Sequence, residues 1–441
     1  MSWRFDILVV GAGPAGIAAA VSAASTGKRV ALVDDNPSPG GQIWRSGSSQ
    51  PAPARKWLAR LNTSSVTRLQ GWCIFDHPGT GTLRAECGND YRDLQFGQLI
   101  LATGARERFL PFPGWTLPNV MGAGGLDAMV RGGLPIAGKR VVVAGTGPLL
   151  LAVAAHVARR GAKIVALCEQ APLRRFAPFL PHLFNEPGKI LQGIAYSMAT
   201  GWARYYTGCW PVAASGGERL ESVTLERNGN RWNEHCDFLA CGFHLVPNLE
   251  LPALLGCRIQ DGFVVTDNLQ RTSVADVFCV GEPTGIGGVD LALLEGRIAG
   301  LAAASRTEEA EKLARVRSRK LGFVRALSAL SVLDPRLKTL ASDTTVVCRC
   351  EDVSFGALRK HHCWRDAKLQ TRCGMGPCQG RICGAATEFL FGWDTASIIA
   401  NSRPPVFPAR VASLGFSGEL ERPGQNPAPA ETLIEIQKET S

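Results

Sequence analysis

This sequence of 441 residues lacks a dense run of basic side chains interleaved with aromatic ones, although its formal net charge is +10. A diffuse positive charge fits anionic cofactor phosphates or an acidic partner surface as well as it fits nucleic acid, so we predict no nucleic-acid partner. The sequence also lacks an apolar run that is typical of a transmembrane segment. The nearest candidate, residues 141–158, contains Gly145-Thr-Gly147-Pro and fits a buried strand followed by a helix.

A secretory signal is not expected either. Asp6 interrupts the apolar run near the N-terminus, and the glycines that follow it fall where a nucleotide-binding loop needs them. Without secretion, the fourteen cysteines indicate a reducing compartment and thiol or metal chemistry rather than a disulfide framework. We therefore expect a cytoplasmic protein, and a loose peripheral association with a membrane stays open.

The stretch from Phe5 to Asp35 has the pattern of a strand, a glycine-rich turn, a helix and a second strand. In such a unit the first glycine makes the tight turn, the second admits a pyrophosphate, and the third lets the helix pack on the strand. Asp34, eighteen residues beyond Gly16, is placed to bind a ribose 2′-OH. The pattern predicts a dinucleotide site formed by Gly11, Gly13, Pro14, Ala15, Gly16, Asp34 and Asp35.

Three later stretches can complete this site. A Pro-Gly-Gly-Gln loop follows the second strand, an apolar strand ends near residue 104, and another ends at residue 282 before a glycine-led helix. Each alone is an ordinary turn, but together with the first fingerprint they form the other walls of a flavin site. The residues concerned are Gly41, Gln42, Thr103, Gly104, Gly281, Glu282 and Gly288.

A second, degenerate copy of the strand-turn-helix-strand pattern spans residues 139–169. Gly145 and Gly147 match the first two glycines, but Leu150 occupies the third position, which weakens close helix–strand packing. Glu169, near the end of the second strand, favours a free ribose 2′-OH over a phosphate. NAD, another adenine nucleotide and a scaffold without ligand all remain open for this unit.

Cysteines form two close pairs near the C-terminus: Cys348 with Cys350, and Cys373 with Cys378. Four thiolates on two short loops can hold a [2Fe–2S] cluster or tetrahedral zinc. The tight first pair and the glycines after Cys373 favour the cluster, whereas zinc and unligated core thiols are the alternatives. Nearby Cys363, Cys383, His361 and His362 are not assigned as ligands: the two histidines with a cysteine could contribute to a metal site, but a partly exposed helix is the favoured interpretation.

The remaining segments carry less information. Cys236 and Cys241 flank an apolar run with strand character, where positions five apart point to opposite faces, so we predict two core cysteines rather than a metal pair. His156 lies on the apolar helix of the second unit and is expected to be a core residue. Residues 305–340 predict a charged helix with a solvated face, for which a docking surface is the sharper alternative.

These motifs together resemble a bacterial family. GAGPAG with Asp34, GGQIW, ATGARER, VGEPTGIGGVDLALLEGRIAG, and above all VCRCEDV with TRCGMGPCQGRICG look like the FAD-binding α subunit of heteromeric amino-acid and amine dehydrogenases. That group includes the A subunit of opine oxidase, the α subunit of D-hydroxyproline dehydrogenase and the B subunit of hydrogen cyanide synthase. The resemblance runs from about residue 4 to residue 390 and extends to the bacterioferritin-associated ferredoxin-like domain.

The resemblance implies an α/β fold: two Rossmann-like dinucleotide-binding domains, as in two-dinucleotide-domain flavoproteins, followed by a small helical [2Fe–2S]-binding domain. It implies FAD at the first site and a cluster on the two cysteine pairs. The expected division is an FAD-binding domain (1–120 and 246–305), a second nucleotide-binding domain (121–245), a helical linker (306–340), a cluster domain (341–392) and a Pro-rich tail (393–441).

The implied role is electron transfer within an enzyme complex. A partner flavoprotein β subunit, with or without a small third subunit, would oxidise an amino-acid substrate, and electrons would leave through FAD and the cluster to an acceptor. Glu282 departs from the Asp that is usual at its position in such flavoproteins. No CxxC pair lies where a thioredoxin-reductase-like enzyme keeps its redox disulfide, which argues against disulfide reduction.

Overall fold

The first sheet has seven strands, and the N-terminal sequence unit supplies its centre. A computed structural model describes residues 3–44, 50–184, 187–394 and 402–415. The strand order is β3-β2-β1-β6-β5-β4, with β19 also paired to β6. The strands are β1 (Trp3–Val10), β2 (Val30–Asp34), β3 (Thr67–Gln70), β4 (Cys73–Gly79), β5 (Thr82–Cys87), β6 (Asp90–Leu101) and β19 (Val277–Cys279). Parallel pairing of β2, β1, β6 and β19 brings their carboxyl ends to one edge, where ligands bind in such sheets.

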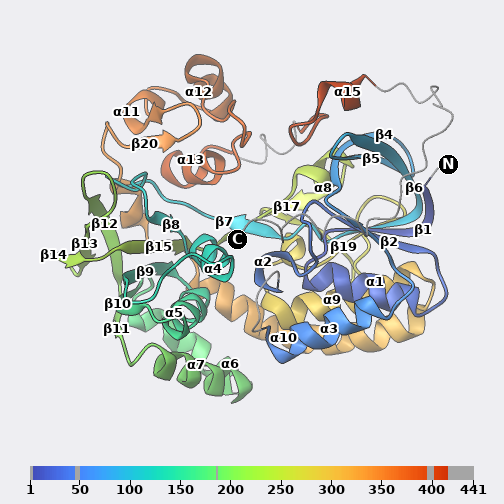
Figure 1. Cartoon of the computed structure of the whole chain (residues 1–441), viewed down its shortest axis with the longest axis horizontal. Coiled ribbons are helices and arrows are strands. Elements are labelled where there is room, and N and C mark those ends of the chain that lie inside the picture. Colours follow the sequence, from blue (N-terminus) through green and yellow to red (C-terminus); the bar gives the residue numbers. More distant parts are fainter. Residues whose placement is uncertain (1–2, 45–49, 185–186, 395–401, 416–441) are drawn as a thin grey trace, which may run out of the picture.

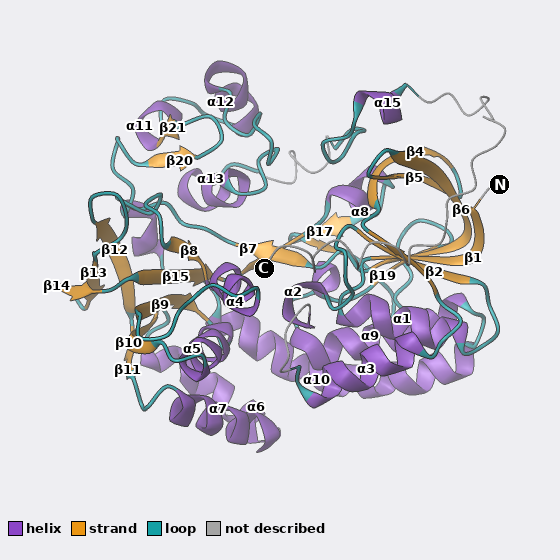
Figure 2. Cartoon of the chain, viewed as in Figure 1, coloured by secondary structure: helices purple, strands orange, loops and turns teal. Residues whose placement is uncertain are grey.

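Four helices cover one face of this sheet, as Figure 2 shows: α1 (Pro14–Ala24), α3 (Ala52–Asn62), α9 (Gly288–Ala303) and α10 (Thr307–Leu330). Alanine-rich α1 and α9 pack closely because Ala18, Ala19 and Ala299 leave little side-chain bulk between the two backbones, and all three are fully buried. After forming the second sheet, the chain therefore returns to the first one, where β19 adds a strand and α9 packs on α1.

The second sheet repeats the arrangement with five strands in the order β11-β10-β9-β15-β8. They are β8 (Val120–Gly122), β9 (Arg140–Thr146), β10 (Lys163–Glu169), β11 (Arg204–Thr207) and β15 (Phe238–Phe243). Helices α4 (Ala123–Arg131), α5 (Leu149–Arg159), α6 (Leu180–Phe184) and α7 (Pro187–Ala199) accompany it, as does an antiparallel sheet of β12 (Cys209–Ser215), β13 (Ser222–Arg227) and β14 (Asn230–His235). Cys236 precedes β15 rather than lying in it, but both Cys236 and Cys241 are buried, as a core position requires.

A two-stranded ribbon connects the two sheets. Strand β7 (Ala105–Glu107) leads away from the first sheet and pairs antiparallel with β16 (Leu245–Pro247), which leads back toward α8 (Glu250–Leu254) and the short hairpin of β17 (Ile259–Gln260) with β18 (Phe263–Val264). In Figure 1 this ribbon lies at the centre of the molecule, between the two halves. Residues on β7 can thus reach both halves.

The C-terminal region is a small cysteine-rich unit above the second sheet (Figure 1). It contains β20 (Val346–Cys348), β21 (Val353–Ser354), α11 (Phe355–Leu358), α12 (Trp364–Thr371) and α13 (Cys383–Phe391). Part of the expected Pro-rich tail then returns to the first sheet: the Val406 N–H donates to the Phe75 carbonyl at 2.9 Å, and α15 (Val411–Leu414) follows. Residues 395–401 and 416–441 of that tail lie outside the described residues.

The charged helix α10 is not solvated all round. The Arg317 side chain lies 2.7 Å from a carboxylate oxygen of Glu295, whose side chain is 1% exposed. This buried ion pair joins α10 to α9. Among the residues that the structure describes, no helix is both long and apolar enough to cross a bilayer.

Candidate functional site

The first glycine loop lies at the carboxyl end of β1 and leads directly into α1. Gly11 has φ +102°, and a Cβ there would approach the Ala102 carbonyl oxygen to 2.2 Å, so only glycine fits. A Cβ built on Gly13 meets nothing within 4 Å, because this part of the loop faces open space. Pro14 and Ala15 begin α1, and Gly16 packs against the Gly11 carbonyl. The loop therefore presents backbone N–H groups and a helix N-terminus to open space, which suits a pyrophosphate.

Two neighbouring segments close around this loop. Asp34 accepts hydrogen bonds from the Ala12 N–H at 2.5 Å and the Asn36 N–H at 2.8 Å, which fixes its carboxylate at the loop. Asp35, the next residue, is exposed. The Gly40 N–H donates to the Ala12 carbonyl at 2.8 Å, and a short helix, α2 (Gly41–Trp44), follows where we expected only a loop. Gly41 and Gln42 therefore lie beside the first fingerprint.

Glu282 provides a test of whether a flavin nucleotide fits. Its Oε2 is buried and has no hydrogen-bond partner, and burial together with Glu295 raises the pKa of Glu282 to about 7. The backbone N–H of Gly288, at the start of α9, acts in the opposite direction and favours the charged form of Glu282, while Gly281 packs against Ala15. A buried carboxylate oxygen without a partner calls for a donor such as a ligand hydroxyl. With the open loop at Gly13, these residues fit a flavin dinucleotide.

The second glycine loop satisfies its own polar groups. Glu169 accepts hydrogen bonds from the Gly147 N–H at 2.7 Å and the Ala171 N–H at 2.8 Å, and burial raises the pKa of this carboxyl group. Gly145 has φ +143° and lies against Gly242, while Leu150 is buried beside the same Gly242. A third glycine on the helix would allow close helix–strand contact. Here Gly242 on strand β15 leaves the room for Leu150 instead.

The end of the linker lies beside this second loop. Gln170 donates to the Val332 carbonyl at 3.1 Å and accepts from the Asp334 N–H at 2.9 Å. His156, expected in the core, instead contacts Asp127 of α4 and is partly exposed. These contacts join the second unit to the end of the linker and α5 to α4.

Five cysteines converge in the C-terminal unit. The sulfur atoms of Cys348, Cys373 and Cys383 lie within 4.8 Å of one another, and all three residues are buried. Hydrogen bonds from the other two thiols lower the pKa of Cys348 to about 2, and the contact of Cys373 with Cys348 raises the pKa of Cys373 to about 12. One hollow is lined by Cys348, Cys350, Cys378 and Cys383, and Cys350 also contacts Cys378.

The sequence reasoning therefore set aside a residue that belongs to this group. Cys383, at the start of α13, lines the hollow, whereas Cys373 is fully buried and does not line it. Cys363 is exposed, and His361 pairs with Asp366 at 2.7 Å, so neither joins the cluster of thiols. Sulfur donors gathered at this density fit an iron–sulfur cluster or zinc.

Two side chains from outside the C-terminal unit also line the hollow. Phe109 and Trp115, which follow β7, line it together with Arg349 and Ile382. The Trp115 Nε1–H donates to the Val346 carbonyl at 2.6 Å, and the Arg349 guanidinium lies 5.4 Å from the Trp115 ring centroid. The hollow therefore lies at a boundary between units, with Cys348 and Cys383 buried, Cys378 half-buried and Cys350 exposed.

Comparison with known proteins identifies the fold. Residues 5–306 match the model of the pyridine nucleotide-disulphide oxidoreductase family. The chain belongs to this family. It is 32% identical to the A subunit of opine oxidase from Rhizobium meliloti strain 1021, over 95% of this chain and 99% of that protein. It is 30% identical to hydrogen cyanide synthase subunit HcnB of Pseudomonas aeruginosa, over 85% and 90%. L-proline dehydrogenase from P. horikoshii has the same fold, with a TM-score of 0.66 and 18% identity over 94% of this chain and 80% of that one.

These similarities confirm the α/β flavoprotein fold, the resemblance to the A subunit of opine oxidase, and an oxidoreductase that binds FAD. They also indicate that the chain is a subunit of a multi-subunit enzyme, since these relatives are named as enzyme subunits and the match covers most of their length. The helical cysteine-rich region at the C-terminus is part of the observed architecture.

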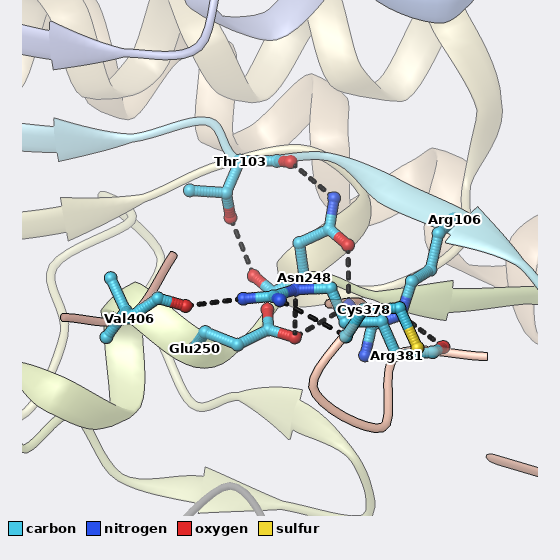
Figure 3. A network of polar contacts seen from close by, with 7 residues as sticks. All are labelled: Thr103, Arg106, Asn248, Glu250, Cys378, Arg381 and Val406. Atoms are coloured by element: carbon cyan, nitrogen blue, oxygen red, sulfur yellow. Dashed lines mark hydrogen bonds and ion pairs between the residues drawn. The ribbon is translucent and has the colours of Figure 1, made fainter. Parts of the chain in front are cut away.

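A polar network joins the predicted flavin turn of this oxidoreductase to the cysteine loop (Figure 3). Thr103 and Asn248 exchange two hydrogen bonds, each 2.8 Å long. From β7, Arg106 donates to Asn248 Oδ1 at 2.7 Å, to Glu250 Oε1 at 2.9 Å, and through Nε to the Arg381 carbonyl at 3.0 Å. Arg106 thereby contacts Asn248, which lies 142 positions later in the sequence, and Arg381, which lies 275 positions later.

Arg381 completes the network on the cysteine side. Its guanidinium donates to the Cys378 carbonyl at 3.2 Å and the Val406 carbonyl at 2.6 Å, and Nε lies 3.3 Å from Glu250 Oε1. Burial lowers the pKa of Arg381, with Glu250 acting in the opposite direction. Sequence reasoning missed this network, although the ATGARER and CQGRIC motifs contain both arginines.

Proposed function

We propose that this chain is the electron-transferring FAD and iron–sulfur subunit of a heteromeric dehydrogenase that acts on the C–N bond of a proline-like or opine-type amino acid. The observation that carries the proposal is the convergence of cysteines at a hollow tied to the flavin turn by Arg106 and Arg381. When bound, FAD supplies conversion between two-electron and one-electron transfer, and a [2Fe–2S] cluster supplies one-electron transfer.

Each group of residues has a part in this proposal. Gly11, Gly13 and Gly16 would seat the FAD pyrophosphate, Asp34 the ribose, and Glu282 a further hydroxyl of the cofactor. Gly288 and its neighbours at the start of α9 would favour negative charge on the bound ligand. Trp115 and Phe109 would shield the buried cysteines of the hollow, Cys348 and Cys383, from water. We find no proton-transfer residue for substrate chemistry in the described part of the chain, so a partner flavoprotein subunit would oxidise the substrate.

The cluster ligands are proposed as Cys348, Cys350 and Cys378 with a fourth thiolate. The sequence spacing favours Cys373, whereas the hollow favours Cys383. In the anaerobically purified chain we expect about two iron and two acid-labile sulfide atoms per chain. Single Ser substitutions at Cys373 and Cys383 decide the question: the variant that loses iron and visible absorption while FAD stays bound identifies the ligand. Zinc without sulfide in the native chain contradicts the proposal and supports a regulatory subunit.

A self-sufficient NAD(P)H oxidoreductase is the alternative, because Gly147 and Glu169 keep the geometry of a nucleotide loop. The two proposals differ in the electron donor. In an anaerobic titration with NADH, we expect no bleaching of the flavin and cluster bands, and full bleaching with dithionite. Rapid bleaching by NADH instead means that the second site binds NAD and that the chain needs no partner as donor.

A further inference from the structure

The second half of the molecule exposes an apolar surface. Large apolar side chains of a soluble domain are normally buried, and those left on the surface are normally scattered. Fifteen are exposed in the described part of the chain, and six of them fall within 23 residues. We call these six the apolar face: Leu180, Phe184, Leu191, Ile194, Met198 and Trp202.

Five of the six residues lie on α6 and α7, and Trp202 lies in the turn that follows α7. Leu191, Ile194 and Met198 are spaced by three and four residues on α7, so they share one side of the helix. Leu191 is 68% and Met198 is 56% exposed. The helix contacts α5 and α6, and α6 contacts α10. Figures 1 and 2 show α6 and α7 at the outer edge of the molecule, away from the ribbon and the cysteine unit.

The described charges near the face in the sequence are mostly positive. The described residues between positions 159 and 205 include seven lysines and arginines but one acid, Glu169, which is 2% exposed. Arg174 and Arg204 are exposed. Lys189 is paired with Asp290 of α9 at 2.8 Å, so one acid from another element does reach the edge of this region. Glu186 lies outside the described residues.

We propose that the apolar face, with its basic rim, docks on an anionic membrane surface. Aliphatic side chains that protrude from a surface helix, bordered by a tryptophan and by arginines, match the interfacial helices that lie in the headgroup region. The arginines would contact lipid phosphates. A second copy of this chain fits less well, because the same positive rim would face itself. The inference is independent of the proposed electron transfer.

Flotation of the purified full chain with lipid vesicles tests the proposal. One set of vesicles contains phosphatidylcholine alone, and the other contains about 30% phosphatidylglycerol as well. We expect binding to the anionic vesicles that weakens as salt rises. The double substitution Leu191→Glu and Met198→Glu should reduce that binding by roughly tenfold or more, because it replaces two inserted apolar side chains with charges. Leu369→Glu on α12, which replaces a leucine of similar exposure (62% against 68% for Leu191), is the matched control and should bind as the native chain does.

Circular dichroism and bound flavin confirm that each variant is folded. Arg174→Glu with Arg204→Glu provides a second test that leaves the apolar side chains in place, and it should lower binding to anionic vesicles severalfold. Absence of native binding to both vesicle types overturns the proposal. So does unchanged binding in the Leu191→Glu and Met198→Glu chain. A dimer in light scattering that the same pair of substitutions dissociates, without vesicle binding, assigns the face to a second copy instead.

Discussion

Arg381 offers the sharpest test of the link between the two halves of the site. Its guanidinium donates to two carbonyl oxygens, of Cys378 and Val406, and its side chain is only 15% exposed. A hydrogen bond from a charged donor contributes about 1.5–3 kcal/mol. The substitution Arg381→Gln shortens the side chain, removes both contacts and leaves Glu250 paired with Arg106 alone. We therefore expect the loop from Cys378 to Ile382 to lose about 2–4 kcal/mol of local stability.

Hydrogen exchange of the amides in this loop measures that loss directly, without requiring the whole chain to unfold in one step. A loss of this size corresponds to exchange that is roughly 30-fold to several hundred-fold faster. Arg365→Gln on α12 is the matched control, because Arg365 is exposed in the same unit. Unchanged protection in Arg381→Gln, or an equal effect in the control, would refute the role assigned to Arg381.

A double-mutant cycle with Glu250→Gln separates the ion pair from the carbonyl contacts. Groups in one network show interaction energies of about 0.5–3 kcal/mol, whereas independent sites add. Since Arg106 and Arg381 both contact Glu250 Oε1, we expect the double variant to lose less than the sum of the single losses. Additive losses would mean that Glu250 stabilises Arg106 and does not interact with Arg381.

Three further outcomes follow from the geometry. Gly11→Ala should abolish flavin binding, because the new Cβ meets the Ala102 carbonyl oxygen at 2.2 Å; yellow, flavin-loaded protein from this variant would contradict the assigned loop. Without flavin, folded Glu282 holds its proton more tightly than the unfolded chain does, since its pKa is raised from 4.5 to about 7, so stability should fall as pH rises through that interval. Glu282→Gln should flatten this part of the curve of melting temperature against pH, and identical slopes in both proteins would exclude Glu282 as its source. Arg317→Met should lower the free energy of unfolding in urea by about 3–5 kcal/mol, because it leaves the buried carboxylate of Glu295 without its ion-pair partner. A loss below about 1 kcal/mol would show that this carboxyl group is neutral in the folded chain.

Sequence patterns predicted those parts of the fold that depend on residues close together in the chain. Both strand-turn-helix-strand units could be located because apolar strands, glycine turns and the acids Asp34 and Glu169 follow one another within about 30 residues. The expected buried pair Cys236 and Cys241 is confirmed as core, although only Cys241 lies in the strand. The antiparallel sheet of β12, β13 and β14 was not foreseen, because only β13 alternates clearly between buried and half-buried positions, and β14 is polar along most of its length.

Spacing could not identify which thiols face the hollow. Four residues separate Cys373 from Cys378 and four separate Cys378 from Cys383, so the sequence offers two equivalent pairs. Only the fold shows that Cys383 lines the hollow and that Cys373 does not. The network of Arg106, Glu250 and Arg381 was inaccessible for another reason: its members come from three distant segments, and only the finished fold brings them together. The same holds for Arg317, which the charge pattern placed in solvent.

The acids that end the second strands have a consequence for how such chains change over time. In both units the carboxylate accepts a hydrogen bond from the glycine loop of its own unit, Asp34 from the Ala12 N–H and Glu169 from the Gly147 N–H. The loop is therefore kept folded by an internal partner whether or not a nucleotide is present. A duplicated unit built in this way can lose or exchange its ligand with little loss of folding stability, so a descendant is free to keep the shape as a spacer between two other working parts.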